Sequence, residues 1–293
     1  MEHARGKLIG KRGLRLSYGQ WYPTSEPKAV ALVVHGYGEH IGRYQHVIDA
    51  LVEREYAVFA IDHRGHGQSE GDRACVERFD YFIQDLHLLV REARDAHPSL
   101  PRVMVGHSMG ALIATRYALR YGEELDLLVL SGIALQIGDD VPAFVKKIGS
   151  VLSTVLPSFP VGEIGKNTLS RDPEVDRRIN ADPLHYRGKM KARMGHEMLQ
   201  AAMESRTRVH QMALPVLIMH GENDKVTNPA GSKFLYETVG SSDKTLKIWD
   251  ANLHEIFNEL EKERIIAYMI DWLDERLASL PATQQKQAAT QLP

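Results

Sequence analysis

The sequence predicts an α/β fold in which a mostly parallel, twisted sheet carries helices on both faces. Short runs rich in β-branched residues alternate with segments whose apolar residues recur at helical spacing. The runs are apolar on both faces, which is typical of parallel strands covered by helices on both sides. The chain has 293 residues, enough to bury a sizeable core without disulfides or metals.

Six runs are predicted as buried strands: residues 29–35, 57–61, 102–106, 125–130, 215–220 and 245–249. Five segments are predicted as helices: residues 43–53, 79–96, 109–121, 231–238 and 259–280. Repeated strand–helix units of this kind build a mostly parallel sheet. Residues 7–21 precede them and are predicted to form an antiparallel hairpin that turns near Lys11, Arg12 and Gly13.

One stretch interrupts this alternation, because no strand pattern is found between Ser131 and Pro215. Residues 141–156 form an amphipathic helix pattern, a second helix is expected to start at Asp172-Pro173, and a third covers about 190–204. We therefore expect a helical cap insertion above the sheet. The predicted division is core 1–135, cap 136–210, core 211–280 and a flexible Gln/Ala/Thr-rich tail 281–293.

Composition narrows the function classes. The net charge is −2 and 25% of residues are charged, so nucleic acid is not an expected partner. The single cysteine, Cys75, cannot form an internal disulfide, which suits a reducing compartment. No run of about 18 apolar residues predicts a transmembrane segment, and residues 1–10 lack the apolar core of a signal peptide. We expect a cytoplasmic protein.

The strongest chemical signal is Gly106-His107-Ser108-Met109-Gly110, placed between a predicted strand and a predicted helix. A serine on so tight a turn is held in a strained conformation that exposes its hydroxyl, and glycines two residues to either side allow close chain approach. The helix N-terminus directs N–H groups toward the same point. This context predicts Ser108 as a nucleophile.

A serine nucleophile needs a base and a carboxylate, in the chain order Ser, acid, His for this type of fold. His254 follows the last predicted strand, and Asp224 follows the one before it. Both lie at carboxyl ends of strands, where sites of open α/β sheets form. Asp224 is the favoured acid because it lies a few residues past its strand, with Glu222 and Asp250 as alternatives.

The oxyanion of an acyl-transfer reaction requires two backbone donors. The N–H of Met109 directly follows the nucleophile, and the N–H of Tyr37 lies in the loop after the first predicted parallel strand. We expect these two groups to form the oxyanion hole.

A metal site is the competing interpretation of the run from Asp62 to Ser69, which contains His63-x-x-His66. No third ligand stands at suitable spacing, and the glycines fit a structured turn after a strand. We therefore expect no metal at this run.

The sequence also resembles the monoacylglycerol lipase family of serine hydrolases with the α/β-hydrolase fold. The resemblance is carried by His35-Gly36-Tyr37-Gly38-Glu39-His40 followed by Gly42-Arg43-Tyr44, by Asp62-x-Arg64-Gly65-His66-Gly67-x-Ser69, and by the Ser108 pentapeptide. It extends to Ser170-Arg171-Asp172-Pro173, Ala181-Asp182-Pro183-Leu184 and Gly221-x-x-Asp224. It departs at Ala111, where many relatives have glycine, and at Phe257, where mammalian relatives have a second histidine.

The resemblance implies hydrolysis of monoacylglycerols to fatty acid and glycerol through an acyl-enzyme, without a cofactor. It places Glu39 and Arg43 near the glycerol end of the pocket, with a structural ion pair as the alternative for the two. A lysophospholipase or a general carboxylesterase with the same triad is the alternative activity. A non-catalytic binding protein on the same fold is disfavoured by the ordered Ser, Asp and His.

The predicted cap helix carries an apolar stripe made of Phe144, Ile148, Val151 and Val155, with Val141 and Leu152 at its edges. Two interpretations stay open for it. The stripe packs on the core, or Val151 and Leu152 contact the acyl chain and the helix makes transient contact with a membrane surface.

Overall fold

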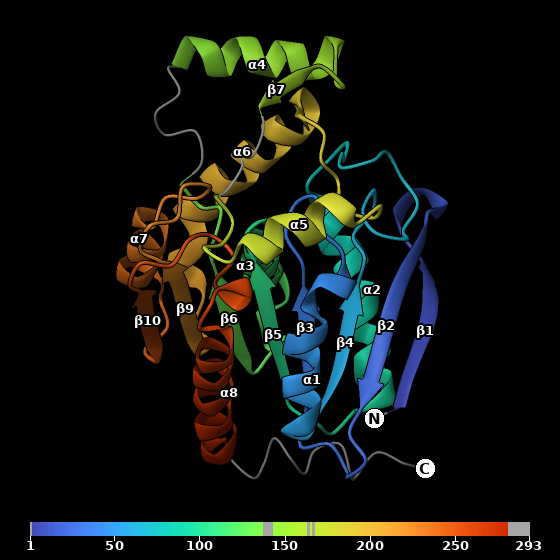
Figure 1. Ribbon diagram of the computed structural model, residues 1–293, viewed down its shortest axis with the longest axis vertical. Coiled ribbons are helices and arrows are strands. Elements are labelled where there is room, and N and C mark those ends of the chain that lie inside the picture. Colours follow the sequence, from blue (N-terminus) through green and yellow to red (C-terminus); the bar gives the residue numbers. More distant parts are fainter. Residues whose placement is uncertain (1, 137–142, 163–164, 166–167, 281–293) are drawn as a thin grey trace.

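A computed structural model describes residues 2–136, 143–162, 165 and 168–280. Its main sheet contains β1 (Glu2–Ile9), β2 (Arg15–Tyr22), β3 (Ala29–Val34), β4 (Tyr56–Ile61), β5 (Arg102–His107), β6 (Leu127–Ser131), β9 (Val216–Gly221) and β10 (Lys244–Trp249). The spatial order is β1-β2-β4-β3-β5-β6-β9-β10 (Figure 1). β2 pairs antiparallel with β1 and β4, whereas all other pairs are parallel. The predicted mostly parallel sheet and its N-terminal hairpin are confirmed.

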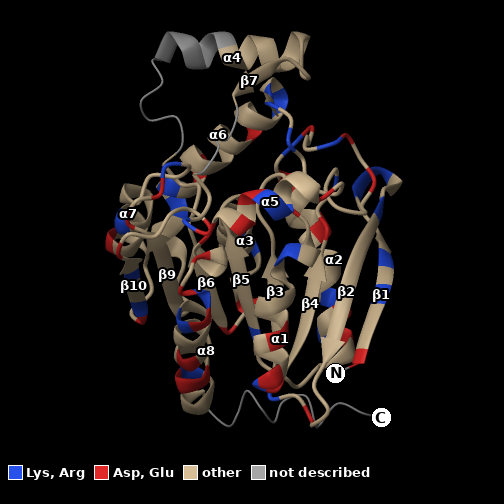
Figure 2. Ribbon diagram, in the orientation of Figure 1, with Lys and Arg blue, Asp and Glu red and all other residues tan. Residues whose placement is uncertain are grey.

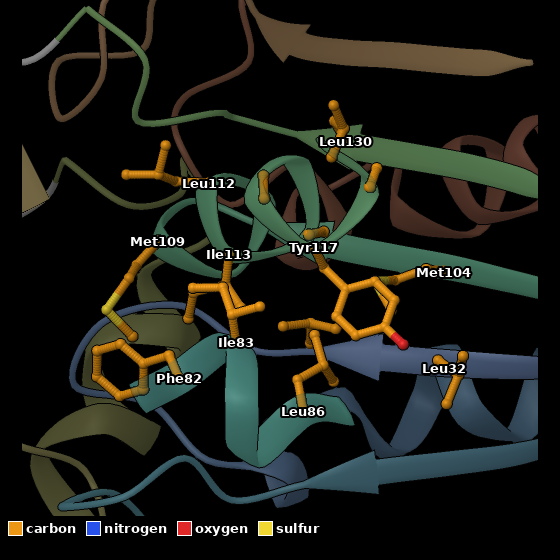
Figure 3. Close-up of a cluster of buried hydrophobic side chains, with 14 of the residues drawn as sticks. Leu32, Phe82, Ile83, Leu86, Met104, Met109, Leu112, Ile113, Tyr117 and Leu130 are labelled. Carbon is orange, nitrogen blue, oxygen red and sulfur yellow. The ribbon is translucent and has the colours of Figure 1, made fainter. Parts of the chain in front are cut away.

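Helices cover both faces of this sheet. α1 (Gln45–Glu53) and α8 (Lys262–Ser279) pack on one face, while α2 (Asp80–Ala96), α3 (Met109–Tyr121) and α7 (Ala230–Thr238) pack on the other. Each strand serves both cores because successive side chains point to opposite faces. In β3, for example, Leu32 joins the core under α2 and α3, and Val33 joins the core under α1 and α8. Figure 3 shows part of the first core, where Phe82 of α2 lies beside Met109 of α3.

The region between β6 and β9 forms a separate layer. It contains α4 (Ala143–Val155), β7 (Pro160–Gly162), α5 (Pro173–Ala181), β8 (Met190–Lys191) and α6 (Ala192–Arg208). Figure 1 shows α5 across the carboxyl ends of the central strands and α4 farthest from the sheet. The expectation that this region holds no strand is wrong, since β7 and β8 pair antiparallel. Their two or three residues are too short to produce a periodic pattern.

Local sequence signals set several boundaries. α5 begins at Pro173 as predicted, because the Asp172 carboxylate accepts the Glu174 N–H at 2.9 Å. Two predicted helices begin later than expected, α1 after a 3-10 turn at Ile41–Tyr44 and α8 after one at Ile256–Asn258. The predicted tail, residues 281–293, lies outside the described residues. Within the described ranges, no helix has the length and apolar character needed to cross a bilayer.

Candidate active site

Ser108 occupies a sharp turn between β5 and α3. Its φ of 55° and ψ of −118° are unusual for a residue with a side chain, and such strain persists only where the surroundings impose it. The Ser108 N–H donates to Ser131 O at 2.8 Å, which ties the turn to β6. The serine is 8% exposed and stands where the first N–H groups of α3 have no partner within the helix. The local structure predicted for Ser108 is confirmed.

The two glycines around Ser108 are required by packing. A Cβ at Gly106 would lie 2.6 Å from Gly110 O, and a Cβ at Gly110 would lie 2.1 Å from Val34 O. Side chains at either position would push α3 away from β3 and β5. The motif therefore brings the helix N-terminus against the strand ends, with the serine hydroxyl above them.

His254 reaches Ser108 from the loop that follows β10. Its Nε2 lies 2.9 Å from Ser108 Oγ, and the side chain is almost fully buried. Gly221, at the end of β9, makes this approach feasible. A Cβ there would lie 2.0 Å from Leu253 O, so any larger residue would displace the loop.

Asp224 meets the other side of the imidazole. Its Oδ2 lies 2.6 Å from His254 Nδ1, and its Oδ1 accepts the Val226 and Thr227 N–H groups at 2.7 and 2.9 Å. The alternatives Glu222 and Asp250 are exposed, and Glu222 Oε2 instead accepts the Ala251 N–H at 3.3 Å. The structure thus brings Ser108, His254 and Asp224 into one hydrogen-bonded chain.

The surroundings keep this chain in the charge state that nucleophilic catalysis needs. Burial alone would raise the pKa of Asp224, but hydrogen bonds from His220 and His254 hold it well below its ordinary value. Burial also disfavours a charged His254, yet the hydrogen bond and charge of Asp224 raise the pKa of His254 above its ordinary value. Asp224 therefore stays ionised, and His254 is a stronger base than an isolated imidazole.

Three neighbours of the triad were not identified from the sequence. His220 Nε2 lies 3.0 Å from Asp224 Oδ2, and the Thr227 hydroxyl lies 2.9 Å from the same oxygen. The His107 ring lies 4.8 Å from that of His254, and burial lowers the pKa of His107 to about 3, so it is neutral. Thr227 could have been found, because an Asp followed by a tight turn bonds backbone groups two or three residues on.

The loop after β3 borders the nucleophile. A Cβ at Gly36 would lie 3.2 Å from Ser108 Cβ, so the backbone leading to Tyr37 runs directly beside the serine. The carbonyl of Gly38, in the same loop, accepts the Tyr186 N–H at 2.8 Å. The backbone leading to Tyr37 and the residue Met109, which directly follows Ser108, thus both adjoin the nucleophile.

Glu39 and Arg43 form the ion pair that the sequence left as one alternative. Arg43 Nε lies 3.5 Å from Glu39 Oε1, and Arg43 Nη2 lies 2.5 Å from Glu255 Oε2. Glu39 Oε2 also accepts the Gly36 N–H and the Tyr44 hydroxyl, each at 2.7 Å. These buried contacts fix the loop that carries Tyr37 and link it to the residue after His254.

The apolar stripe of the predicted helix 141–156 was expected either to pack on the core or to contact lipid. The structure distinguishes these two interpretations for Val151 and Val155. Val151 is 61% exposed and Val155 69% exposed, whereas Leu152 is half-buried. The prediction that the stripe packs on the core is therefore wrong for Val151 and Val155. The side chains of Val141, Phe144 and Ile148 lie outside the described residues.

The run from Asp62 to Ser69 folds as a structured turn. The Asp62 carboxylate accepts the Ile41 and Gln68 N–H groups, each at 2.9 Å, and joins this turn to the loop after β3. Within the part of the chain that the structure describes, no three His, Cys, Asp or Glu side chains are grouped to hold a metal.

Comparison with known proteins identifies clear relatives. Residues 25–261 match the family described as serine aminopeptidase, S33. The chain is 36% identical to a monoacylglycerol lipase from Mycolicibacterium smegmatis, covering 91% of this chain and 95% of that protein. It is 34% identical to a human monoglyceride lipase, covering 93% and 91% respectively. The crystal structure of a monoacylglycerol lipase from Paleococcus ferrophilus superimposes with a TM-score of 0.78 at 26% identity, covering 94% of this chain and all of that one.

Proposed function

Because the chain belongs to the monoacylglycerol lipase family of α/β-hydrolase-fold serine hydrolases, we propose that it hydrolyses monoacylglycerols to fatty acid and glycerol. The observation that carries the proposal is the hydrogen-bonded chain from Ser108 through His254 to Asp224. The matching family carries the description of a peptidase. The bacterial and human relatives reported above, which align over more than 90% of their own length, are named lipases.

The reaction proceeds through an acyl-enzyme. His254 Nε2 takes the Ser108 proton as Oγ attacks the ester carbonyl carbon, and the N–H groups of Tyr37 and Met109 stabilise the oxyanion. The imidazolium then donates its proton to the departing glycerol oxygen. Water, deprotonated by His254, attacks the acyl carbon in the same way and releases the fatty acid. Asp224 fixes the tautomer of His254 and stabilises its charged form.

Glu39 and Arg43 are assigned to the glycerol end of the site. The support for it is the position of Glu39, which accepts the Gly36 N–H beside Ser108. The ion pair with Arg43 fits the structural alternative, in which the two residues hold the Gly36–Tyr37 backbone. The further link from Arg43 to Glu255 connects that backbone to the histidine loop. In this arrangement both residues support the oxyanion loop.

Residues 136–210 are assigned as the cap, and α4 as the element that receives lipid. The support comes from an exposed apolar surface composed of Val151, Val155, Leu156, Phe159 and Val161. Figure 2 shows no charged residue on the described end of α4 or on β7. Exposed apolar surface of this kind marks interaction sites, and interfacial helices bind lipid through such a face. We assign it to acyl-chain entry and transient contact with a membrane surface.

The test is a hydrolysis panel of monoacyl-, diacyl- and triacylglycerols beside lysophosphatidylcholine. We expect monoacylglycerols to be the preferred substrates. Ser108→Ala and His254→Ala should each lower kcat by roughly 10⁶. Preference for lysophosphatidylcholine would instead establish the lysophospholipase alternative, and unchanged activity of Ser108→Ala would refute the serine mechanism.

A further inference from the structure

The cap touches the loop of the catalytic histidine at the segment Leu169, Ser170 and Arg171, just before α5. We propose that this segment braces the His254 loop, and that Arg171 and Glu259 are positioning residues for His254. The inference rests on the proposed role of His254 as the catalytic base. It gives a purpose to the Ser170-Arg171-Asp172-Pro173 motif, which the reaction itself does not use.

The sheet supports the histidine loop on one side only, where the Asn223 N–H after β9 donates to Asn252 O at 2.9 Å. β10 is the last strand in the sheet and pairs only with β9. Residues that follow an edge strand have a neighbouring strand on one side only. The other side of the loop must be held by something else if His254 is to stay within 2.9 Å of Ser108.

Arg171 supplies part of that support. Its guanidinium Nε donates to Glu259 Oε2 at 3.0 Å, and its Nη2 donates to Asn252 Oδ1 at 2.8 Å and also pairs with Glu261. One side chain from the cap thus contacts residues before and after His254. A planar guanidinium can direct several donors at once, which a lysine ammonium cannot reproduce in the same geometry.

Glu259 completes the connection. Its side chain is fully buried, and its Oε1 accepts the Leu253 N–H at 2.7 Å. The same carboxylate that binds Arg171 therefore binds the backbone immediately before His254. Without the Arg171 guanidinium, the negative charge of Glu259 would remain buried with only backbone N–H donors. Burying a carboxylate without a positive partner strongly destabilises the folded state.

The backbone immediately after His254 is held by the same cap segment. The Glu255 N–H donates to Leu169 O at 2.7 Å, and the Ser170 hydroxyl donates to Asn258 O at 2.9 Å. The N–H groups on both sides of His254 are thus satisfied by the brace, one through Glu259 and one directly. The cap fixes the backbone from which the imidazole projects.

This arrangement divides the cap into two functional parts. The segment before α5 is bonded to the histidine loop, whereas α4 and β7 lie farther from the sheet (Figure 1). The proposed lipid contact at α4 does not involve the residues of the brace. Displacement of the Leu169–Arg171 segment would release the catalytic base.

The experiment measures kcat and KM for hydrolysis of a short soluble ester. This reaction does not depend on lipid entry through α4. Arg171→Ala and Glu259→Gln are expected to lower kcat by roughly 10²-fold, because catalytic groups displaced by about 1 Å lose that much. KM should change little. The rate of Ser108 labelling by a fluorophosphonate should fall with kcat, and added guanidinium ion should restore part of the activity of Arg171→Ala.

The matched control is Arg177→Ala, which removes an exposed arginine of α5 whose partner is Glu174. It should leave kcat unchanged. Arg171→Lys tests the need for the guanidinium geometry, and it stays informative if Arg171→Ala unfolds. We expect Arg171→Lys to lose most of the kcat that Arg171→Ala loses.

A pH profile separates positioning from stability. The groups that face His254 are Asp224, Glu255, Glu39 and the His107 ring, and the hydrogen bond to Asp224 raises the pKa of His254. A loosened loop weakens that hydrogen bond and lowers the pKa of His254. The acid limb of the kcat/KM profile should therefore move to lower pH in Glu259→Gln. A purely structural role would lower Tm and leave the acid limb in place.

The outcomes distinguish this inference from the proposed function. Full kcat and an unshifted pH profile in Arg171→Ala and Glu259→Gln would overturn the brace, while an inactive His254→Ala would leave the function intact. Activity in His254→Ala would overturn the proposed function itself.

Discussion

The Asp224 carboxylate has more hydrogen-bond donors than a simple ion pair would supply. Its Oδ1 accepts two backbone N–H groups, and its Oδ2 lies within reach of His254, His220 and Thr227. This set of donors favours the ionised form and fixes the direction in which the carboxylate points. The imidazole of His254 is thereby held with Nδ1 protonated and Nε2 free to accept the serine proton.

We therefore predict that Asp224→Asn lowers kcat by roughly 10⁴, because an amide cannot stabilise the imidazolium or select its tautomer. Asp250→Asn, at an exposed carboxylate beside the same loop, should leave kcat unchanged. The measurement is kcat for a soluble ester with both variants. A larger loss in Asp250→Asn would show that the acid has been misassigned.

The sequence was sufficient to predict that Ser108, Asp224 and His254 lie together, because each has a local signature. Ser108 lies between glycines on a strand-to-helix turn, and Asp224 and His254 each follow a buried strand. Glu255 and His220 have no such signature. Their importance comes from contacts with Arg43 and Asp224, and the first of these pairs is separated by more than two hundred residues.

At the scale of elements, α4 differs from the helices that pack on the sheet. α3 buries nearly all of its apolar side chains, whereas α4 exposes Val151 and Val155. Each CH₂ transferred from water to an apolar phase contributes about 0.8 kcal/mol, so an exposed stripe is costly unless lipid covers it for part of the time.

We predict that Val151→Ser lowers kcat/KM for a long-chain monoacylglycerol by at least about fourfold, the equivalent of one CH₂ contact. A short soluble ester and Tm should be unaffected, because the side chain is exposed. Leu152→Ser is the matched comparison. Leu152 is half-buried, so this variant should also lower Tm.

Equal losses on the two substrates would contradict lipid entry through α4.

The same helix shows what periodicity can and cannot predict. The stripe was visible in the sequence, but whether it faces protein or solvent depends on the position of α4 relative to α6 and the sheet. The pairing of β7 with β8 was missed for a related reason, since it is set by tertiary contact.

At the scale of the whole molecule, the mostly parallel sheet was predictable because apolar strand patterns alternate with helix patterns, and such units pair their strands in parallel. The order of the strands was not predicted, because it is set by tertiary contacts. The same core also buries polar rings. Burial lowers the pKa of His35 to about 4 and of His66 and His107 to about 3, and it lowers the pKa of His63 well below its ordinary value. These histidines are neutral in the folded protein.

Their depressed pKa values make stability depend on pH in a defined direction. Above the unfolded-state value of about 6.5, both states carry neutral histidines and the full stability is present. Below that value the unfolded chain binds protons that the folded chain does not. Each such histidine then costs about 1.4 kcal/mol per pH unit until the pH reaches its folded-state pKa.

We predict that His63→Leu makes the protein less sensitive to acid. Neither ring nitrogen of His63 has a hydrogen-bond partner, and the ring packs against His35 and Phe82, so an apolar side chain loses no polar contact. The free energy of unfolding, measured with urea from pH 8 to pH 5, should fall less steeply below about pH 6.5 than in the wild type. His210→Gln, at an exposed histidine, should follow the wild-type curve. Parallel curves for His63→Leu and the wild type would mean that His63 binds its proton equally well in both states, and that burial does not exclude it.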